Sequence, residues 1–365
     1  MDLNNIRLAR LQNQQICRQS FKTTCDLATW MGAMQAQNYG MMKWALGIRL
    51  PNAALMEVTK ALNEGHILRT HLMRPTWHIV SATDIRWIIE LTATQILSGL
   101  KSRHKELELT KNLLLKTNKI IVKAIEKNGH QTRDELIVEF EKANISLDNN
   151  RAAHFFMIAE LEGLICSGIE KNNKTTYALL EERVPEKKTL SRDEAVAKLA
   201  YKYFHSHAPA TLKDFIWWSG LTVKDARQGL ESNKSKLISE KTNLGTFWFP
   251  ADFIFNNPPE TDVFLLPAFD EFIISYKNRD LVLSSTNFAK SISSNGVFRP
   301  VIVINGKVTG TWKQVIKKDQ IIIETELLRK HSKEEIASLE SFGQKLGKFY
   351  NKQAVIKNDV VLKVI

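Results

Sequence analysis

The chain has 365 residues, 44 % of them hydrophobic, and its lysines and arginines outnumber its aspartates and glutamates by 51 to 39, a formal net charge of +12. This length suits two to four modules of about 60 to 150 residues each. Three cysteines without a CxxC pair favour a reducing compartment over a disulfide framework, no apolar run approaches the ~18 residues of a membrane span, and the polar N-terminus does not resemble a signal peptide.

The positive charge is spread along the chain instead of being concentrated in a tail. A spread of this kind favours a polyanionic partner such as nucleic acid. Many soluble proteins are basic for no specific reason, so the charge alone leaves both interpretations open.

Residues 1–115 begin with three expected helices, over residues 6–18, 24–37 and 52–63, and continue into the extended stretch HILRTHLMRPTWHIV. At about 100° per residue, Gln35 and Gln37 fall on the two shoulders of the apolar stripe of the second helix. Two residues apart, they do not face each other on an intact helix. Either the helix loosens before Gly40 and both amides reach one cavity, or they cap carbonyls at a helix end.

Residues 116–186 show the order helix, helix, helix, hairpin. The first helix stops at Gly129, Thr132 and Glu135 form a capping box for the second, and the third ends near Gly163, before an alternating segment. This is the chain order of a winged helix. The third helix occupies the position from which side chains read bases, although many winged helices touch only phosphate or protein.

The same order recurs loosely over residues 191–250, and after Pro258 and Pro259 the sequence becomes β-rich, with an Asn305-Gly306 hairpin turn, a helix over residues 332–350 and a final strand over residues 354–365. We therefore predict an α+β fold of tandem winged-helix units with a C-terminal β-barrel-like domain. Helix-helix-helix-hairpin is also common topology that need not imply repeats. The expected boundaries are 1–115, 116–186, 187–257 and 258–365.

Hairpin turns of the second and third units carry lysines that are candidates for phosphate contacts: Lys171, Lys174 and Lys241. A lysine at a hairpin tip is also an ordinary solubilising residue. The sequence has no HExxH, EF-hand, P-loop or GxGxxG motif, so we expect neither a metal nor a cofactor.

Four blocks of the sequence resemble, in order, the winged-helix family of alkylpurine and crosslink-unhooking DNA glycosylases of the AlkZ/YcaQ type. They are LATWMGAMQAQNYG, GHILRTHLMRPTWHIVSATDIRWI, LLPAFDEFIISYKNRD and RPVIVINGKVTGTWK. In that family a Q-aliphatic-Q motif lies at the catalytic centre, so the resemblance implies Gln35 and Gln37 as catalytic residues. An R-T-x-x-x-R-x-T-x-H element implies supporting or DNA-binding roles for Arg69, Thr70, Arg74, Thr76 and His78. Pro75 stands where the family pattern has glycine.

The chemistry of amides limits the reaction that such a site can catalyse. A glutamine transfers no proton at neutral pH, but it can orient a water molecule and turn a dipole toward positive charge. Purines alkylated at N7 or N3 carry a positive charge and leave as neutral bases, so they need no acid. We therefore expect a monofunctional, water-using DNA glycosylase of base excision repair that acts on cationic N-alkylated purines, with interstrand crosslinks as further substrates.

The expected partner is duplex DNA containing alkylated purines, bound by a monomer that is cytoplasmic and nucleoid-associated, without membrane contact. In the extended stretch, alternation places Arg74, Thr76 and His78 on one face and Arg69 on the other, unless a bulge near Pro75 resets the register. The alternative functions are a non-enzymatic winged-helix DNA-binding protein or transcriptional regulator, and a protein-binding scaffold.

Overall fold

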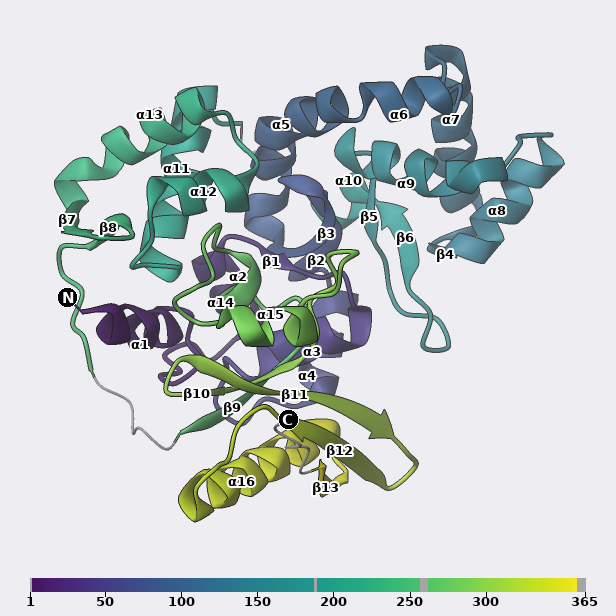
Figure 1. Cartoon of the computed structure of the whole chain (residues 1–365). Helices are drawn as coiled ribbons and strands as arrows, with labels where there is room; N and C mark the ends of the chain where they lie inside the picture. The colour runs from purple at the N-terminus through teal and green to yellow at the C-terminus, as the bar shows by residue number, and fades with distance from the viewer. Residues whose placement is uncertain (1, 187–188, 257–261, 360–365) are drawn as a thin grey trace.

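A three-stranded antiparallel sheet lies at the centre of the molecule (Figure 1). The structure, a computed structural model, describes residues 2–186, 189–256 and 262–359. The sheet has the strand order β1-β3-β2. The elements of this part are α1 (Leu3–Asn13), α2 (Thr24–Met31), β1 (Met34–Gln35), α3 (Tyr39–Gly47), α4 (Leu55–Asn63), β2 (Ile67–Leu72), β3 (Arg74–Ser81), α5 (Ala82–Gly99) and α6 (Lys101–Glu106).

The helix expected over residues 24–37 is wrong in its second half. It ends at Met31 because Gly32 takes a φ of 75°, a conformation that interrupts a helix and suits glycine. Met34 and Gln35 then pair with β3 as a short strand. The first helix likewise ends at Asn13 and not at residue 18, and the helix α3 was not predicted.

The second and third units have the predicted order of helices followed by a hairpin. The second contains α7 (Lys111–Asn128), β4 (Gln131–Thr132), α8 (Arg133–Lys142), η1 (Asp148–Asn150), α9 (Arg151–Leu161), β5 (Ile165–Ser167), β6 (Thr176–Leu179) and α10 (Leu180–Arg183). The third contains α11 (Arg192–Ser206), α12 (Leu212–Ser219), α13 (Val223–Asn233), η2 (Lys234–Lys236), β7 (Leu237–Thr242) and β8 (Gly245–Pro250). The predicted capping box of Thr132 and Glu135 at the start of α8 is confirmed.

The C-terminal part is a curled five-stranded sheet with the strand order β13-β12-β11-β10-β9, on which α16 packs (Figure 1). Its elements are β9 (Val263–Leu266), α14 (Glu271–Ile274), α15 (Ser285–Ser291), β10 (Val301–Ile304), β11 (Lys307–Ile316), β12 (Gln320–Leu327), α16 (Lys333–Tyr350) and β13 (Gln353–Asp359). Asn305 and Gly306 both have positive φ in the predicted turn between β10 and β11. The end of the expected last strand, residues 360–365, and the boundaries at residues 187 and 257–258 lie outside the described residues, and the division into four domains stays a prediction.

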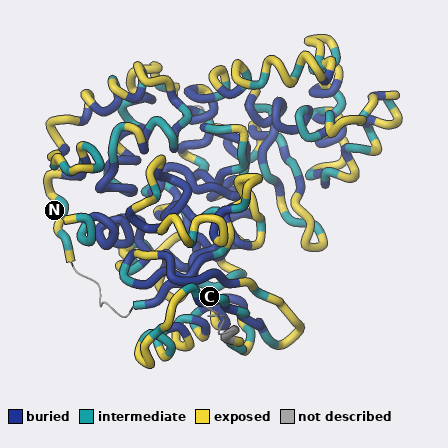
Figure 2. The backbone as a smooth tube through the Cα atoms, in the orientation of Figure 1, coloured by how far each residue is buried: buried dark blue, intermediate teal, exposed yellow. Residues whose placement is uncertain are grey.

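Two hydrophobic cores meet at the central sheet. Met34 and Ile79 belong to the core shared with the C-terminal part, whereas Leu68 and Val80 belong to the core shared with the third unit. Because alternate residues of a strand point to opposite faces, each face of the sheet is covered by a different core. Figure 2 shows the buried backbone running through this centre, with exposed segments around it. Among the described helices, none has the length and hydrophobicity that crossing a membrane requires.

Candidate active site

The two motif glutamines lie on β1 and immediately after it. Gln35 is buried, and its side-chain Oε1 accepts a hydrogen bond from Nη2 of Arg74 at 2.9 Å. Gln37 is exposed, and its Oε1 lies 3.4 Å from the backbone N–H of Trp77. The N–H of Ala36 donates to the carbonyl of Trp77 at 2.7 Å, so pairing with β3 continues beyond Gln35. Residues two apart on an extended chain point to one side. The extended backbone of β1 and the residues after it, and not a loosened helix or a helix end, therefore turns both glutamine side chains to the same side.

His78 lies directly opposite Gln35 in the strand register. Its Nδ1 is 2.9 Å from the carbonyl oxygen of Thr76, and a carbonyl only accepts, so Nδ1 carries the proton and Nε2 is an acceptor. Burial and the neighbouring charge of Arg74 lower the pKa of His78 to about 3. The ring is therefore neutral at physiological pH.

Four buried polar atoms in this region have no hydrogen-bond partner in the part of the chain that the structure describes. They are Thr70 Oγ1, Arg74 Nε, Thr76 Oγ1 and His78 Nε2. Buried polar groups are normally paired, and a group of unpaired ones is typical of a place that holds ordered water or part of a ligand. The cluster beside Gln35 thus has both donors and acceptors to offer a small polar molecule.

Arg69 supports the glutamine motif from the other face of the sheet. It pairs in register with Ile79, and its Nε donates to the carbonyl of Ala36 at 3.0 Å. Its guanidinium lies 4.2 Å from the centre of the Trp77 ring. The prediction that Arg74 and His78 share one face of the sheet is confirmed, since both lie beside Gln35. The prediction that Arg69 lies on the other face is also confirmed. The register shift near Pro75 falls between His71 and Leu72 of β2 and leaves the pairing of Arg69 intact.

Glu271 binds the backbone of β1 at Gln35. It was not singled out from the sequence, although it lies in a block that carries the family resemblance. Its carboxylate is 1 % exposed and accepts hydrogen bonds from the backbone N–H of Gln35, from Nε1 of Trp218 and from the hydroxyl of Ser275. Nε2 of His207 lies 3.4 Å away. Burial alone raises the pKa of Glu271, but His207, the hydroxyl of Ser275 and the backbone N–H of Gln35 outweigh it and bring the pKa to about 2. A buried, ionised carboxylate therefore stands directly behind Gln35.

The lysines proposed for phosphate contact have different surroundings. Lys174 lies 2.8 Å from Asp134 and Lys171 lies 3.9 Å from Glu135, both acidic residues of α8. Lys241 is exposed near the end of β7. The first two already have carboxylate partners, although exposed ion pairs of this kind are weak enough to exchange for a phosphate.

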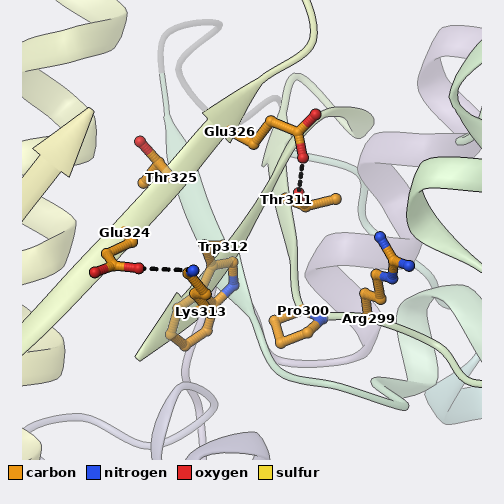
Figure 3. Close-up of a pocket in the computed structure, with 8 residues that line it drawn as sticks. All are labelled: Arg299, Pro300, Thr311, Trp312, Lys313, Glu324, Thr325 and Glu326. Atoms are coloured by element: carbon orange, nitrogen blue, oxygen red, sulfur yellow. Dashed lines mark hydrogen bonds and ion pairs between the residues drawn. The ribbon is translucent and has the colours of Figure 1, made fainter. Parts of the chain in front are cut away.

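An open cleft of about 500 Å³ lies elsewhere, along β11 and β12 of the C-terminal sheet (Figure 3). Its two glutamates are occupied, since Glu324 pairs with Lys313 at 2.9 Å and Glu326 pairs with Lys290 at 2.9 Å. The glutamine motif contributes no residue to its lining. Within the described residues, no group of three or more His, Cys, Asp or Glu side chains is arranged to hold a metal ion.

Helix-helix-hairpin units gathered around a polar cluster on a central sheet define a protein of the tandem winged-helix class. A model of the family described as DNA glycosylase AlkZ-like matches residues 28–349. The chain therefore belongs to the AlkZ-like family of DNA glycosylases.

Among solved structures, the DNA glycosylase AlkZ of Streptomyces sahachiroi has a TM-score of 0.82 to this chain at 18 % sequence identity, with 98 % of this chain and 100 % of the other covered. That likeness confirms the predicted fold class of winged-helix units with a C-terminal barrel-like sheet. A search of curated protein sequences finds no match.

Proposed function

We propose that this chain is a monofunctional DNA glycosylase that uses water to hydrolyse the N-glycosidic bond of cationic N-alkylated purines in duplex DNA. The observation that carries the proposal is that none of the side chains of the cluster beside Gln35 can give a proton to a leaving base near neutral pH. Gln35 and an uncharged His78 are buried, Gln37 is exposed, and the carboxylate of Glu271 is ionised and accepts hydrogen bonds from the backbone N–H of Gln35 and from Nε1 of Trp218. Such a site offers no acid to an uncharged leaving base, so it suits a base that is already cationic.

In this mechanism Gln37, the exposed amide, orients the attacking water through its carbonyl oxygen. Gln35 is fixed by Arg74 and turns its amide toward the sugar. Positive charge that develops on the sugar in the transition state is stabilised by fixed dipoles and by the ionised Glu271 behind them. His78 accepts a hydrogen bond at Nε2 and helps to hold the water.

The same reasoning extends to substrate size and partners. The exposure of Gln37 supports an open site, which a bulky interstrand crosslink can approach without entering a closed base-flipping pocket. The net charge of +12 supports binding through phosphates, and a monomer suffices because one chain carries all the winged-helix units. We propose crosslink unhooking, a monomeric state and a cytoplasmic, nucleoid-associated location on this basis.

Release of free 7-methylguanine from methylated duplex DNA by the purified protein tests the proposal. We expect release by the wild-type chain, an intact abasic strand before alkali treatment, and much slower release by Gln37→Ala. An unmethylated duplex is the control. Binding of methylated DNA without base release would instead support a non-enzymatic DNA-binding protein.

A further inference from the structure

Three positively charged side chains surround the indole ring of Trp217. Its indole is half-buried on α12, and Nε1 donates to the carbonyl of Ile274 at 2.8 Å, which fixes the ring against the C-terminal part. Three cations approach this one ring: the distance from its centre is 4.7 Å to Nζ of Lys277, 5.2 Å to Cζ of Arg279 and 5.8 Å to Cζ of Arg74. They come from β3 and from the segment after α14.

Among the described residues, these three cations lack the acidic partners that two buried cations of this protein have. Arg49 lies 2.8 Å from Asp270 and Lys202 lies 2.9 Å from Asp84. Within residues 2–186, 189–256 and 262–359, no carboxylate oxygen lies within 4 Å of the charged nitrogens of Arg74, Lys277 or Arg279.

Asp214, whose charge acts on Arg279, makes its hydrogen bonds with other groups. Asp214 accepts from the backbone N–H of Lys277 at 2.9 Å and from Thr211. Two guanidinium nitrogens, Nε of Arg74 and Nη2 of Arg279, are buried without a hydrogen-bond partner among the described residues. Burial lowers the pKa of Arg279, and the neighbouring charge of Arg74 lowers it further, to about 10. An anion bound here would reduce the repulsion between the guanidinium groups and would accept hydrogen bonds from their unpaired donors.

The position of the three cations identifies the kind of anion. Arg74 also holds the amide of Gln35, so an anion at this group would lie beside the damaged nucleotide. A cationic purine would be repelled by three positive charges, whereas a phosphate would be attracted by all of them. We propose that Arg74, Lys277 and Arg279, arranged around Trp217, bind a backbone phosphodiester of the DNA next to the nucleotide whose base is removed. This inference rests on the proposed function.

The charge of each DNA phosphate can be removed individually by a methylphosphonate substitution. The experiment uses short duplexes with an uncleavable abasic analogue at one position and a single methylphosphonate at each neighbouring phosphate in turn. Binding is measured by fluorescence anisotropy at fixed salt. With the wild-type chain we expect one or two positions to weaken binding about 10-fold, the scale of a charge-assisted hydrogen bond, while the others change little.

The protein variants assign that position to the cluster. In Arg279→Gln and in Lys277→Gln, the methylphosphonate at the sensitive position should weaken DNA binding by less than about 2-fold, because the substitution has already removed the interaction with that phosphate. Lys277 is exposed, so its variant does not depend on a buried side chain for folding. Lys348→Gln, the loss of an exposed lysine near the end of α16, is the matched control and should keep the full 10-fold loss.

Uniform sensitivity at all positions, an unchanged loss in both cluster variants, or no DNA binding at all would overturn the phosphate site. Inorganic phosphate at matched ionic strength should compete no better than chloride, and strong competition would point to a free-phosphate site instead. Base release measured with the same proteins separates the two proposals. If the protein excises bases but no methylphosphonate weakens binding, only the phosphate site is refuted. If a methylphosphonate weakens binding but no base is released, the glycosylase activity is refuted and the phosphate site is retained.

Discussion

Removing the carboxylate of Glu271 is expected to loosen the glutamine motif and to destabilise the whole chain. In Glu271→Ala the backbone N–H of Gln35 and Nε1–H of Trp218 lose their acceptor inside the protein. Each buried, unpaired donor costs about 1–3 kcal/mol, and the hydroxyl of Ser275 can rotate to another partner. The loss should total about 4 kcal/mol, within the range for breaking a buried charge network. Glu271→Gln keeps one carbonyl oxygen and should lose about half as much.

The assay is unfolding by heat and by denaturant, followed by tryptophan fluorescence, with base release measured well below the unfolding temperature. Base release should fall more than DNA affinity, because the anchor of β1 is lost while the cationic surface remains. Glu162→Ala is the control, since Glu162 is exposed and accepts one side-chain hydrogen bond, from Asn118, and it should cost less than about 1 kcal/mol.

Acid gives this prediction a second test. The folded pKa of Glu271 is about 2, below the ordinary value of 4.5, so the carboxylate contributes stability above about pH 4.5 and loses it as the pH falls toward 2. The stability gap between the wild type and Glu271→Gln should therefore narrow in that window and stay constant between pH 6 and 8. A Glu271→Ala variant as stable as the wild type and equally active would refute the reasoning.

Three further outcomes are expected. Gln37→Ala should slow single-turnover release of 7-methylguanine by about 10-fold to 1000-fold with DNA affinity nearly unchanged, while Gln37→Asp should stay active because a carboxylate still accepts from water; an equal loss of binding and release would make the glutamine structural. Since the pKa of His78 is about 3 in the fold and 6.5 ordinarily, His78 alone should lower the stability by about 1.4 kcal/mol per pH unit as the pH falls from 6.5 toward 3, and His78→Gln should reduce the slope of stability against pH by that amount in denaturation curves taken across pH. Gly220→Ala places a Cβ at a φ of +67° and 2.3 Å from the carbonyl oxygen of Met73, so the melting temperature should drop and base release should fall as the turn before Arg74 shifts; an unchanged melting temperature would contradict the contact.

The parts of the fold that were predictable from the sequence depend on local signals. The capping box of Thr132 and Glu135 and the Asn305-Gly306 turn act within a few residues of themselves, so the sequence pattern locates them. The error over residues 24–37 arose because apolar spacing alone does not distinguish a helix from a helix followed by a strand. Pairing with β3 decided the outcome, and such pairing is a tertiary effect.

The candidate site was predictable only where a family motif marked it. Gln35, Arg74 and His78 were found through the resemblance, and the alternation of β3 placed the last two on one face. Glu271 and Trp217 were not found, because their importance depends on contacts with residues that are distant in sequence. A glutamate in a helix of four residues has no local pattern that marks it as an anchor for a strand near the N-terminus.

The hydrogen bond between the backbone of Gln35 and the carboxylate of Glu271 spans 236 positions of the chain. Contacts with such a separation form late, because the intervening chain must first be ordered. During synthesis the glutamine motif therefore leaves the ribosome long before its anchor does, and a truncated or half-made polypeptide holds both amides without the geometry to use them. For a member of a DNA glycosylase family, this delay means that only a finished molecule holds the glutamine motif in place.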